Sequence, residues 1–326
     1  MPTKNYLKLH NACKTGNIRE VNDLLAAGNS MNELAICPEY LDYTPLETVA
    51  RYGQTELMQS LLSRQDVLRL VRKGSSLYVA AEYGQEEMVK LLLQYKADVN
   101  VEYVSVVPRV YTRPISIATV NGHDNIVRLL LDEQARTLEI YDHGNTLLHE
   151  AAAFENLVIL QLLIDRQVDS VNATNEFGRT PLHAIANAKH RPDENPKRIP
   201  GLFKDSDSLS KNAERVVQIL LQNKADINAQ DQNGNTALHL AVNPGRLSLF
   251  DLDAGLTPVQ VVKHKLGLIQ QLVLGGIDPL ITNKKGQKAS DLSILPKVST
   301  FLQEYEAKVL KEKKDLKEKR ICSRLC

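Results

Sequence analysis

Gly144-Asn-Thr-Leu-Leu-His149-Glu-Ala-Ala152 is the clearest copy of a motif that recurs along the chain. Gly178-Arg-Thr-Pro-Leu-His183-Ala and Gly234-Asn-Thr-Ala-Leu-His239-Leu-Ala241 repeat it with small changes. Thr is a good N-cap and Pro suits a first helical turn, so a short helix is predicted to begin at each Thr. The Leu then faces a core, and the small Ala residues allow another helix to pack closely against it.

The copies of this motif are regularly spaced. Positions aligned with its Thr are 7, 44, 75, 113, 146, 180, 236 and 288. The first five intervals, between 31 and 38 residues, cluster around a repeat of about 33 residues. The last two intervals, 56 and 52 residues, each correspond to one repeat with an insertion.

A second apolar block follows each copy of the motif. Val21, Val89 and Val127 are each followed by Leu-Leu at the third and fourth positions, which predicts the apolar stripe of a returning helix. Asp231-Gln-Asn-Gly234 then predicts the turn of a projecting hairpin. Glycines that favour positive φ stand where the first helix must stop, at Gly16, Gly53, Gly84 and Gly122. One such unit cannot bury its own apolar face, but stacked units share a continuous core.

These features resemble the ankyrin-repeat family over about residues 5–295. The resemblance implies seven to eight repeats in an all-α solenoid with hairpin fingers. It also implies that the recurring histidines hydrogen-bond the backbone of a neighbouring loop, namely His10, His149, His183 and His239. The first copy lacks Thr and Pro, and the last, from Lys284 to Leu292, is polar, so both are expected to be caps.

Two insertions interrupt the array of residues 1–295. Residues 187–211 carry three Pro with Lys, Asp and Ser and are interpreted as a mobile loop in repeat six. Residues 243–256 split repeat seven in the same place, although Thr257-Pro258-Val259 would alternatively begin a truncated extra repeat. We favour the insertion because Asp226 and Asp278 then align.

A charged C-terminal helix, residues 296–326, is predicted to follow the array. A spacing of three and four residues joins Leu302, Tyr305, Val309, Glu312 and Leu316. Residues 307–326 contain eight Lys or Arg and three acidic residues. We interpret the segment as a solvated helix, with a short coiled coil or contact with RNA or an anionic membrane as alternatives. Cys322 stands one position too early for a prenylation box, and palmitoylation of Cys322 or Cys326 stays open.

Composition narrows the class of function. With 40 Lys and Arg against 39 Asp and Glu, the net charge of +1 does not favour nucleic-acid binding. The four Cys are too few and too scattered for a disulfide framework or a zinc cluster, and no phosphate loop or hydrolase motif occurs. We expect no catalytic, cofactor or metal site. The chain has no signal-peptide core and no long apolar run, so we expect a cytoplasmic protein without a membrane span, and a monomer.

The sequence predicts a non-catalytic module that binds a protein partner through its hairpin tips and the concave helix face. Aromatic and Arg side chains are the types that carry interface energy. The candidates are Tyr103, Arg109 and Tyr111 in a lengthened finger at 99–112, His143, Phe177 and Arg179 in hairpins, and Tyr52 and Tyr83 near the ends of first helices. For Tyr52 and Tyr83, packing between adjacent repeats is an equal alternative.

Three other functional hypotheses follow from features that differ from a regular repeat array: the insertions, the basic tail and the composition. An enzyme would build its site from the insertions at 187–211 and 243–256, which are neighbours in the predicted stack. An adaptor would be localised by its basic tail. Irregular repeats with many Lys and Asn and no Trp are also typical of ankyrin proteins that intracellular bacteria deliver into host cells. In that case the protein would act in the host cytosol as an effector.

Overall fold

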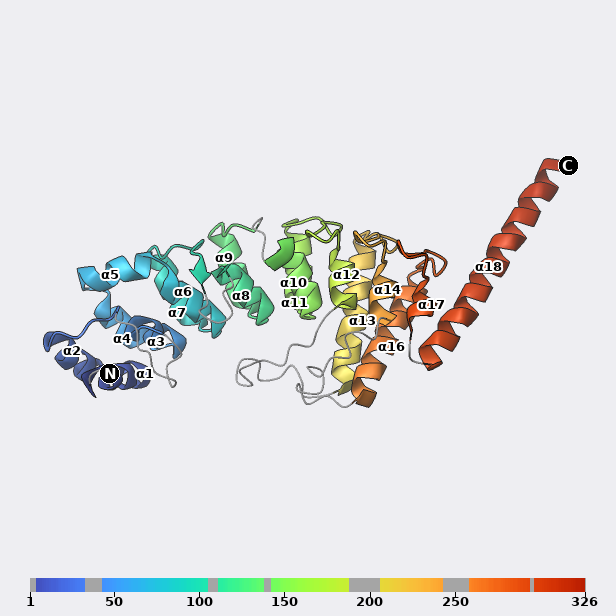
Figure 1. Cartoon of the computed structure of the whole chain (residues 1–326). Helices are drawn as coiled ribbons and strands as arrows, with labels where there is room; N and C mark the ends of the chain where they lie inside the picture. Colours follow the sequence, from blue (N-terminus) through green and yellow to red (C-terminus); the bar gives the residue numbers. More distant parts are fainter. Residues whose placement is uncertain are drawn as a thin grey trace. The chain divides into compact units, whose positions relative to one another are not determined.

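The computed structural model describes residues 4–32, 43–104, 111–137, 142–187, 206–242, 258–293 and 296–325. The chain forms two compact units, Met1–Asp142 and His143–Cys326, and each is described by itself (Figure 1). Helices dominate both units, which confirms the predicted all-α repeat architecture. None of the helices in the described ranges combines the length and the apolar character that crossing a bilayer requires.

The described part of unit 1 contains four helical hairpins, the additional helix α5 (Gln65–Arg72) and a pair of short strands. Its helices are α1 (Lys4–Thr15), α2 (Ile18–Ala26), α3 (Pro45–Arg51), α4 (Thr55–Leu61), α5 (Gln65–Arg72), α6 (Ser75–Glu82), α7 (Glu86–Gln94), α8 (Pro114–Val120) and α9 (Asp124–Asp132). The first helices α1, α3, α6 and α8 pack against one another in that order, and α4, α7 and α9 form the row behind them. The two strands β1 (Tyr103–Val104) and β2 (Tyr111–Thr112) pair antiparallel, with Tyr103 opposite Thr112, which confirms the hairpin finger.

Unit 2 repeats the arrangement. A short 3-10 turn, η1 (Asp142–Gly144), precedes α10 (Leu147–Ala153), α11 (Leu157–Asp165), α12 (Pro181–Ala186), α13 (Ser206–Gln222), α14 (Ala237–Val242), α16 (Pro258–Leu274), α17 (Ala289–Leu292) and α18 (Pro296–Leu325). The first helices α10, α12, α14 and α17 pack in sequence, and α11, α13 and α16 form the second row. Helix α16 therefore lies in the second row beside α13, and the insertion before it stays a prediction.

The first helices begin where the motif predicts. Thr44 caps α3 in a capping box, in which its Oγ1 accepts from Glu47 N at 3.2 Å and Glu47 Oε2 accepts from Thr44 N at 2.8 Å. Thr146 and Thr180 cap α10 and α12, and there a histidine takes the place of the Glu. The start of each of these helices is thus determined locally, by two side chains that lie three residues apart in the sequence.

The recurring histidines join consecutive repeats, as the family resemblance implied. In unit 2, Nδ1 of each ring accepts from the backbone N–H of the N-cap Thr, so the ring is neutral with its proton on Nε2. Nε2 then donates to the carbonyl oxygen just before the next N-cap position. These bonds run from His10 to Tyr43 at 2.9 Å, His149 to Arg179 at 2.8 Å, His183 to Asn235 at 3.0 Å and His239 to Gln287 at 3.0 Å. Burial lowers the pKa of His149, His183 and His239 below the usual range.

Glycines occupy the predicted left-handed positions after the first helices. Gly16, Gly53, Gly84 and Gly122 have φ values of 70°, 65°, 70° and 74°. In repeat five the same position is filled by Glu155, which has φ of 56° and is 8% exposed. Glu155 therefore combines an unfavourable backbone conformation with a buried carboxyl group.

Helix α5 is a difference from the expected pattern. It stands where a hairpin would connect the second and third repeats, and Val67 and Val71 on one of its faces are fully buried. The repeat pattern predicts a hairpin there, and the apolar spacing of Val67 and Val71, a single helical turn, is too short a signal to predict a helix. The connection from α5 into α6 then passes through Gly74, whose φ is 85°.

We expect Gly74→Ala to lower the free energy of unfolding by about 2 kcal/mol. A Cβ atom at Gly74 would lie 2.6 Å from the Asp98 carbonyl oxygen and 2.8 Å from Val101 Cβ, besides adopting a positive φ. Gly28→Ala is the matched control, since Gly28 has φ of 91° but nothing within 4 Å of its added Cβ. Urea unfolding of both variants measures the difference. Equal losses would show that the close approach of Asp98 is without consequence.

Helix α13 begins at Ser206, so the last residues of the segment interpreted as a loop are helical. Residues 188–205 and 243–257 lie outside the described residues, and the two predicted loops stay predictions there. The assignment of residues 1–295 and 296–326 as separate domains likewise stays a prediction.

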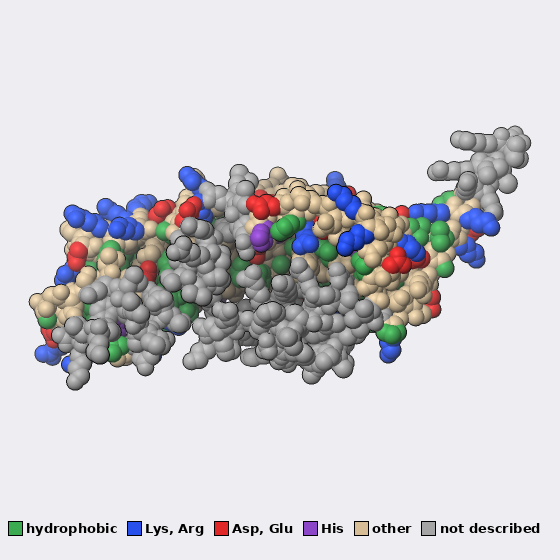
Figure 2. Space-filling model, viewed as in Figure 1, with side chains coloured by type: hydrophobic (Ala, Val, Ile, Leu, Met, Phe, Trp, Pro, Cys, Tyr) green, Lys and Arg blue, Asp and Glu red, His purple; other side chains and the backbone are tan. Residues whose placement is uncertain are grey.

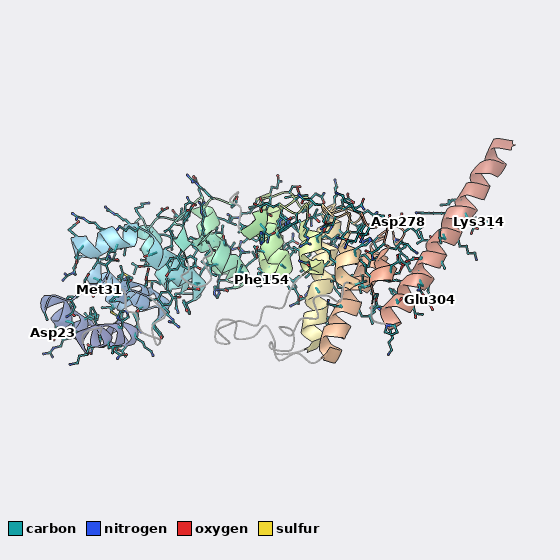
Figure 3. The ribbon with its side chains drawn as sticks, viewed as in Figure 1. Asp23, Met31, Phe154, Asp278, Glu304 and Lys314 are labelled. Atoms are coloured by element: carbon teal, nitrogen blue, oxygen red, sulfur yellow. The ribbon has the colours of Figure 1, made fainter. Side chains whose placement is uncertain are left out.

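The C-terminal helix α18 is fastened to the last repeats by its first turns. Leu302 is fully buried, and the Tyr305 hydroxyl donates to the Ile277 carbonyl oxygen at 3.0 Å. Lys288 forms an ion pair with Glu306, and Lys313 Nζ lies 2.8 Å from Oδ2 of Asp278, which is labelled beside α18 in Figure 3. The first part of the predicted coiled-coil seam is thus used within the chain.

Candidate partner-binding surface

Three of the predicted residues come together at the hairpin tips of unit 2. Phe177 has a 39% exposed side chain, and its ring centroid lies 4.9 Å from that of His143. The Arg179 guanidinium carbon lies 5.4 Å from the same ring. We call these three residues the tip cluster. Figure 2 shows histidine, hydrophobic and basic side chains side by side on the face over these hairpins.

Local backbone chemistry presents the tip cluster. Asn175 Oδ1 accepts from the backbone N–H groups of Phe177 at 2.9 Å and Arg179 at 3.0 Å, which closes the hairpin turn. The next hairpin is joined to this one, because Gln232 N donates to the Phe177 carbonyl oxygen at 2.9 Å. The Phe177 side chain is therefore exposed on a backbone that is held at both ends.

Arg179 forms an ion pair with a buried carboxylate. Its Nε lies 3.4 Å from Oδ2 of Asp231, whose side chain is only 1% exposed. Asp231 Oδ1 accepts from the backbone N–H groups of Asn233 at 2.8 Å and Asn235 at 2.9 Å, so the carboxylate also shapes its own hairpin. Arg179 thus reaches the Phe177 ring in one fixed orientation.

The finger of unit 1 uses its aromatic residues differently. The Tyr103 ring is stacked on that of Tyr78, with centroids 4.2 Å apart and planes 3° apart. Tyr78 stands at the position that His occupies in the clearest repeats, so this stacking replaces the histidine bond to the next loop. Tyr111 contributes its backbone to the strand pair, and Arg109 lies outside the described residues. The proposed binding roles of these finger residues stay predictions.

Tyr52 and Tyr83 lie at the C-terminal ends of α3 and α6, where both side chains are partly exposed. Each ring lies beside the guanidinium group of Arg51, with distances from its central carbon to the ring centroids of 5.5 Å and 4.7 Å. The sequence reading missed Arg51. It is the residue directly before Tyr52, at the last helical position of α3, and its neighbours in the sequence do not mark it. Phe154, labelled in Figure 3, occupies the position equivalent to Tyr52 in α10.

Burial changes the pKa of two titratable groups outside the tip cluster, Cys13 and Glu155. Burial raises the pKa of the Cys13 thiol to about 12, so it is a thiol rather than a reactive thiolate at neutral pH. Burial raises the pKa of the Glu155 carboxyl to about 8. Within the part of the chain that the structure describes, no group of three His, Cys, Asp or Glu residues is arranged to hold a metal ion.

Known families match three parts of the chain. The match to ankyrin repeats (3 copies) covers residues 9–103, the match to a single ankyrin repeat covers 143–176, and the match to ankyrin repeats (many copies) covers 209–252. The first segment lies in unit 1 and the other two lie in unit 2. His143 of the tip cluster is the first residue of the segment 143–176.

Curated relatives and a solved structure agree with these matches. The chain is 27% identical over 254 residues to the nuclear factor NF-kappa-B p105 subunit of Gallus gallus, covering 71% of this chain and 24% of that protein. It is 31% identical over 130 residues to ankyrin repeat domain-containing protein 53 of Homo sapiens, covering 40% and 21%. The matched part thus spans about a quarter or less of each relative's length. The human ASB11 ankyrin repeat domain shares the fold, with a TM-score of 0.54, 19% identity and coverage of 82% of this chain and 96% of that one.

Proposed function

The chain belongs to the ankyrin-repeat family, and we propose that it binds a protein partner through the tip cluster and the face of its first helices. Ankyrin repeats indicate a protein–protein interaction module. The observation that carries the tip-cluster assignment is the exposed Phe177 ring, which is flanked by His143 and Arg179. Phe and Arg on a rigid backbone are favourable contact residues, because little side-chain freedom is lost on binding.

We expect Phe177→Ala to weaken partner binding at least tenfold, since a central aromatic contact contributes about 2 kcal/mol or more. Val158→Ala is the matched control, because Val158 on α11 is an even more exposed apolar side chain, at 58%. Quantitative affinity purification from the native cell, with wild type and both variants as baits, measures the effect. Identical partner lists and recoveries for all three baits would overturn the assignment of Phe177.

The partner-binding role is proposed as a non-catalytic one. This proposal is supported by the contacts of the polar residues in the described repeats. The motif's histidines hydrogen-bond the protein's own backbone, and Arg179 pairs with Asp231, so these side chains stabilise the fold. We propose action as a monomer in the cytoplasm, or in the host cytosol if an intracellular bacterium delivers the protein. Fractionation of cells that express a tagged chain, with light scattering of the purified protein, tests both statements. Recovery from another compartment or a dimeric mass would contradict them.

A further inference from the structure

A second cluster of exposed and charged side chains lies in unit 1, far along the chain from the tip cluster. Arg51, at the end of α3, lies among three tyrosine rings, with 5.3 Å to the centroid of Tyr43, 5.5 Å to Tyr52 and 4.7 Å to Tyr83. Lys14, from the end of α1, has its Nζ 5.3 Å from the centroid of Tyr52. We call these five residues the arginine–tyrosine cluster.

The arginine of this cluster is held by rings rather than by a carboxylate. Among the described residues, none forms an ion pair with Arg51, and its buried Nη1 has no hydrogen-bond acceptor. The acidic group that contacts the cluster is Glu82, which is 3% exposed and accepts from the Tyr43 hydroxyl at 2.9 Å. Among the described residues, these contacts therefore bring together two cations, Arg51 and Lys14, and one buried acid.

The rings give Arg51 a fixed orientation before any partner arrives. Tyr43 is 7% exposed and packs edge-on against Tyr83, with centroids 6.3 Å apart. Rings on several sides attract the cation and restrict its rotation, so less entropy is lost when a partner binds. A guanidinium group has a planar set of donors that matches a carboxylate in two parallel hydrogen bonds. The cluster thus has the charge, the shape and the preorganisation that a carboxylate requires.

We propose that the arginine–tyrosine cluster binds an Asp or Glu side chain in an acidic segment of the protein partner. This inference deepens the proposed function: it rests on the binding of a protein partner, and is independent of the tip cluster. Because Nη1 is buried, Arg51 supplies the paired hydrogen bonds from Nε and Nη2. Lys14 adds long-range attraction, and the partly exposed Tyr52 and Tyr83 rings flank the acidic side chain. Charge complementarity selects this occupant, because an apolar or basic segment would leave Arg51 with an uncompensated charge.

A peptide selection tests the proposal on the intact chain. A phage library of random dodecamers is selected against wild type, and the best peptide is synthesised with its acidic residue and with the matching amide. Fluorescence anisotropy then compares wild type with Arg51→Met, which keeps an unbranched apolar stem without the charged guanidinium group, and with Arg69→Met. Arg69 is an exposed arginine on α5 and serves as the matched control.

We expect the selected peptides to be enriched in Asp or Glu. Arg51→Met should weaken binding at least tenfold, and Arg69→Met should change it less than twofold. The acid-to-amide change in the peptide should cause the same loss on wild type but no further loss on Arg51→Met. The acid-to-amide comparison on wild type uses the unaltered protein. It therefore tests the proposal even if the Arg51→Met variant is unstable.

Three results would overturn the proposal: no selected peptide, selected peptides without acidic residues, or equal binding by the Arg51→Met and Arg69→Met variants. Competition of inorganic phosphate for the site, with no effect of the acid-to-amide change, would also overturn it in favour of a phosphate ligand. The Phe177→Ala variant separates the two proposals. If acidic peptides bind through Arg51 while Phe177→Ala leaves partner recovery unchanged, the tip-cluster assignment fails and the arginine–tyrosine cluster stands.

Discussion

Glu155→Gln is expected to raise the free energy of unfolding by about 3 kcal/mol at pH 8, and by less than about 1 kcal/mol at pH 4.5. The physical reason is burial, which raises the pKa of this carboxyl from 4.5 to about 8. An acid with a raised pKa contributes its full stability below pH 4.5 and loses it as pH rises toward 8. The amide has the same shape but no charge, so it removes this loss.

Hydrogen exchange of the amides in α10 and α11 measures the effect locally, without requiring the whole chain to unfold in one step. Glu176→Gln is the matched control, because Glu176 is an exposed acid in the same unit, and its change should stay within about 0.5 kcal/mol. Exchange that is equally fast in wild type and Glu155→Gln at pH 8 would show that the buried carboxyl does not limit stability.

His183→Ala is expected to lower the free energy of unfolding of unit 2 by about 3 kcal/mol. The ring is 1% exposed and satisfies two backbone groups, the N–H of Thr180 at 3.2 Å and the carbonyl oxygen of Asn235 at 3.0 Å. Alanine would leave both groups without this partner and would leave a cavity. Since Asn235 belongs to the next hairpin, the loss should extend from α12 to the following repeat. Hydrogen exchange of peptides from 175–187 and 230–242 measures it.

The same ring gives unit 2 an acid-sensitive component. Burial lowers the His183 pKa, so stability is fully present above the unfolded value of about 6.5 and is lost as pH falls below it. We therefore expect the stability difference between wild type and His183→Ala to shrink on acidification. His143→Asn is the control, because His143 is exposed and Asn tolerates its φ of 66°. A pH-independent difference would contradict the assigned neutral ring.

The parts of the fold that could be predicted from the sequence are those with a local cause. Thr44 and Glu47 fix a helix start within three residues, and Gly53 ends the same helix because positive φ favours glycine. The repetition of the motif made these helix boundaries easier to predict, since each weak copy of the motif could be aligned with a strong one. Helix α5 was not predicted, because one turn of apolar spacing competes poorly with an expected hairpin.

The candidate sites were predicted only in part, because their contacts join distant residues. The grouping of Phe177 with His143 spans one repeat and follows from the stacking of hairpins. The ion pair between Arg179 and Asp231 crosses an insertion whose length gives no clue to the register. Arg51 was missed for another reason, since its meaning depends on rings that three different segments bring to it.

Site-specific photo-crosslinking at Phe177 tests the central claim most directly. A photoreactive phenylalanine analogue replaces Phe177 in one sample and Val158 in another, and irradiation in the native cell is followed by mass spectrometry of the adducts. Our account predicts a discrete protein adduct from position 177 that is absent or much weaker from position 158. Adducts of equal yield and identity from both positions, or none from position 177 while the protein is bound to its partner, would contradict it.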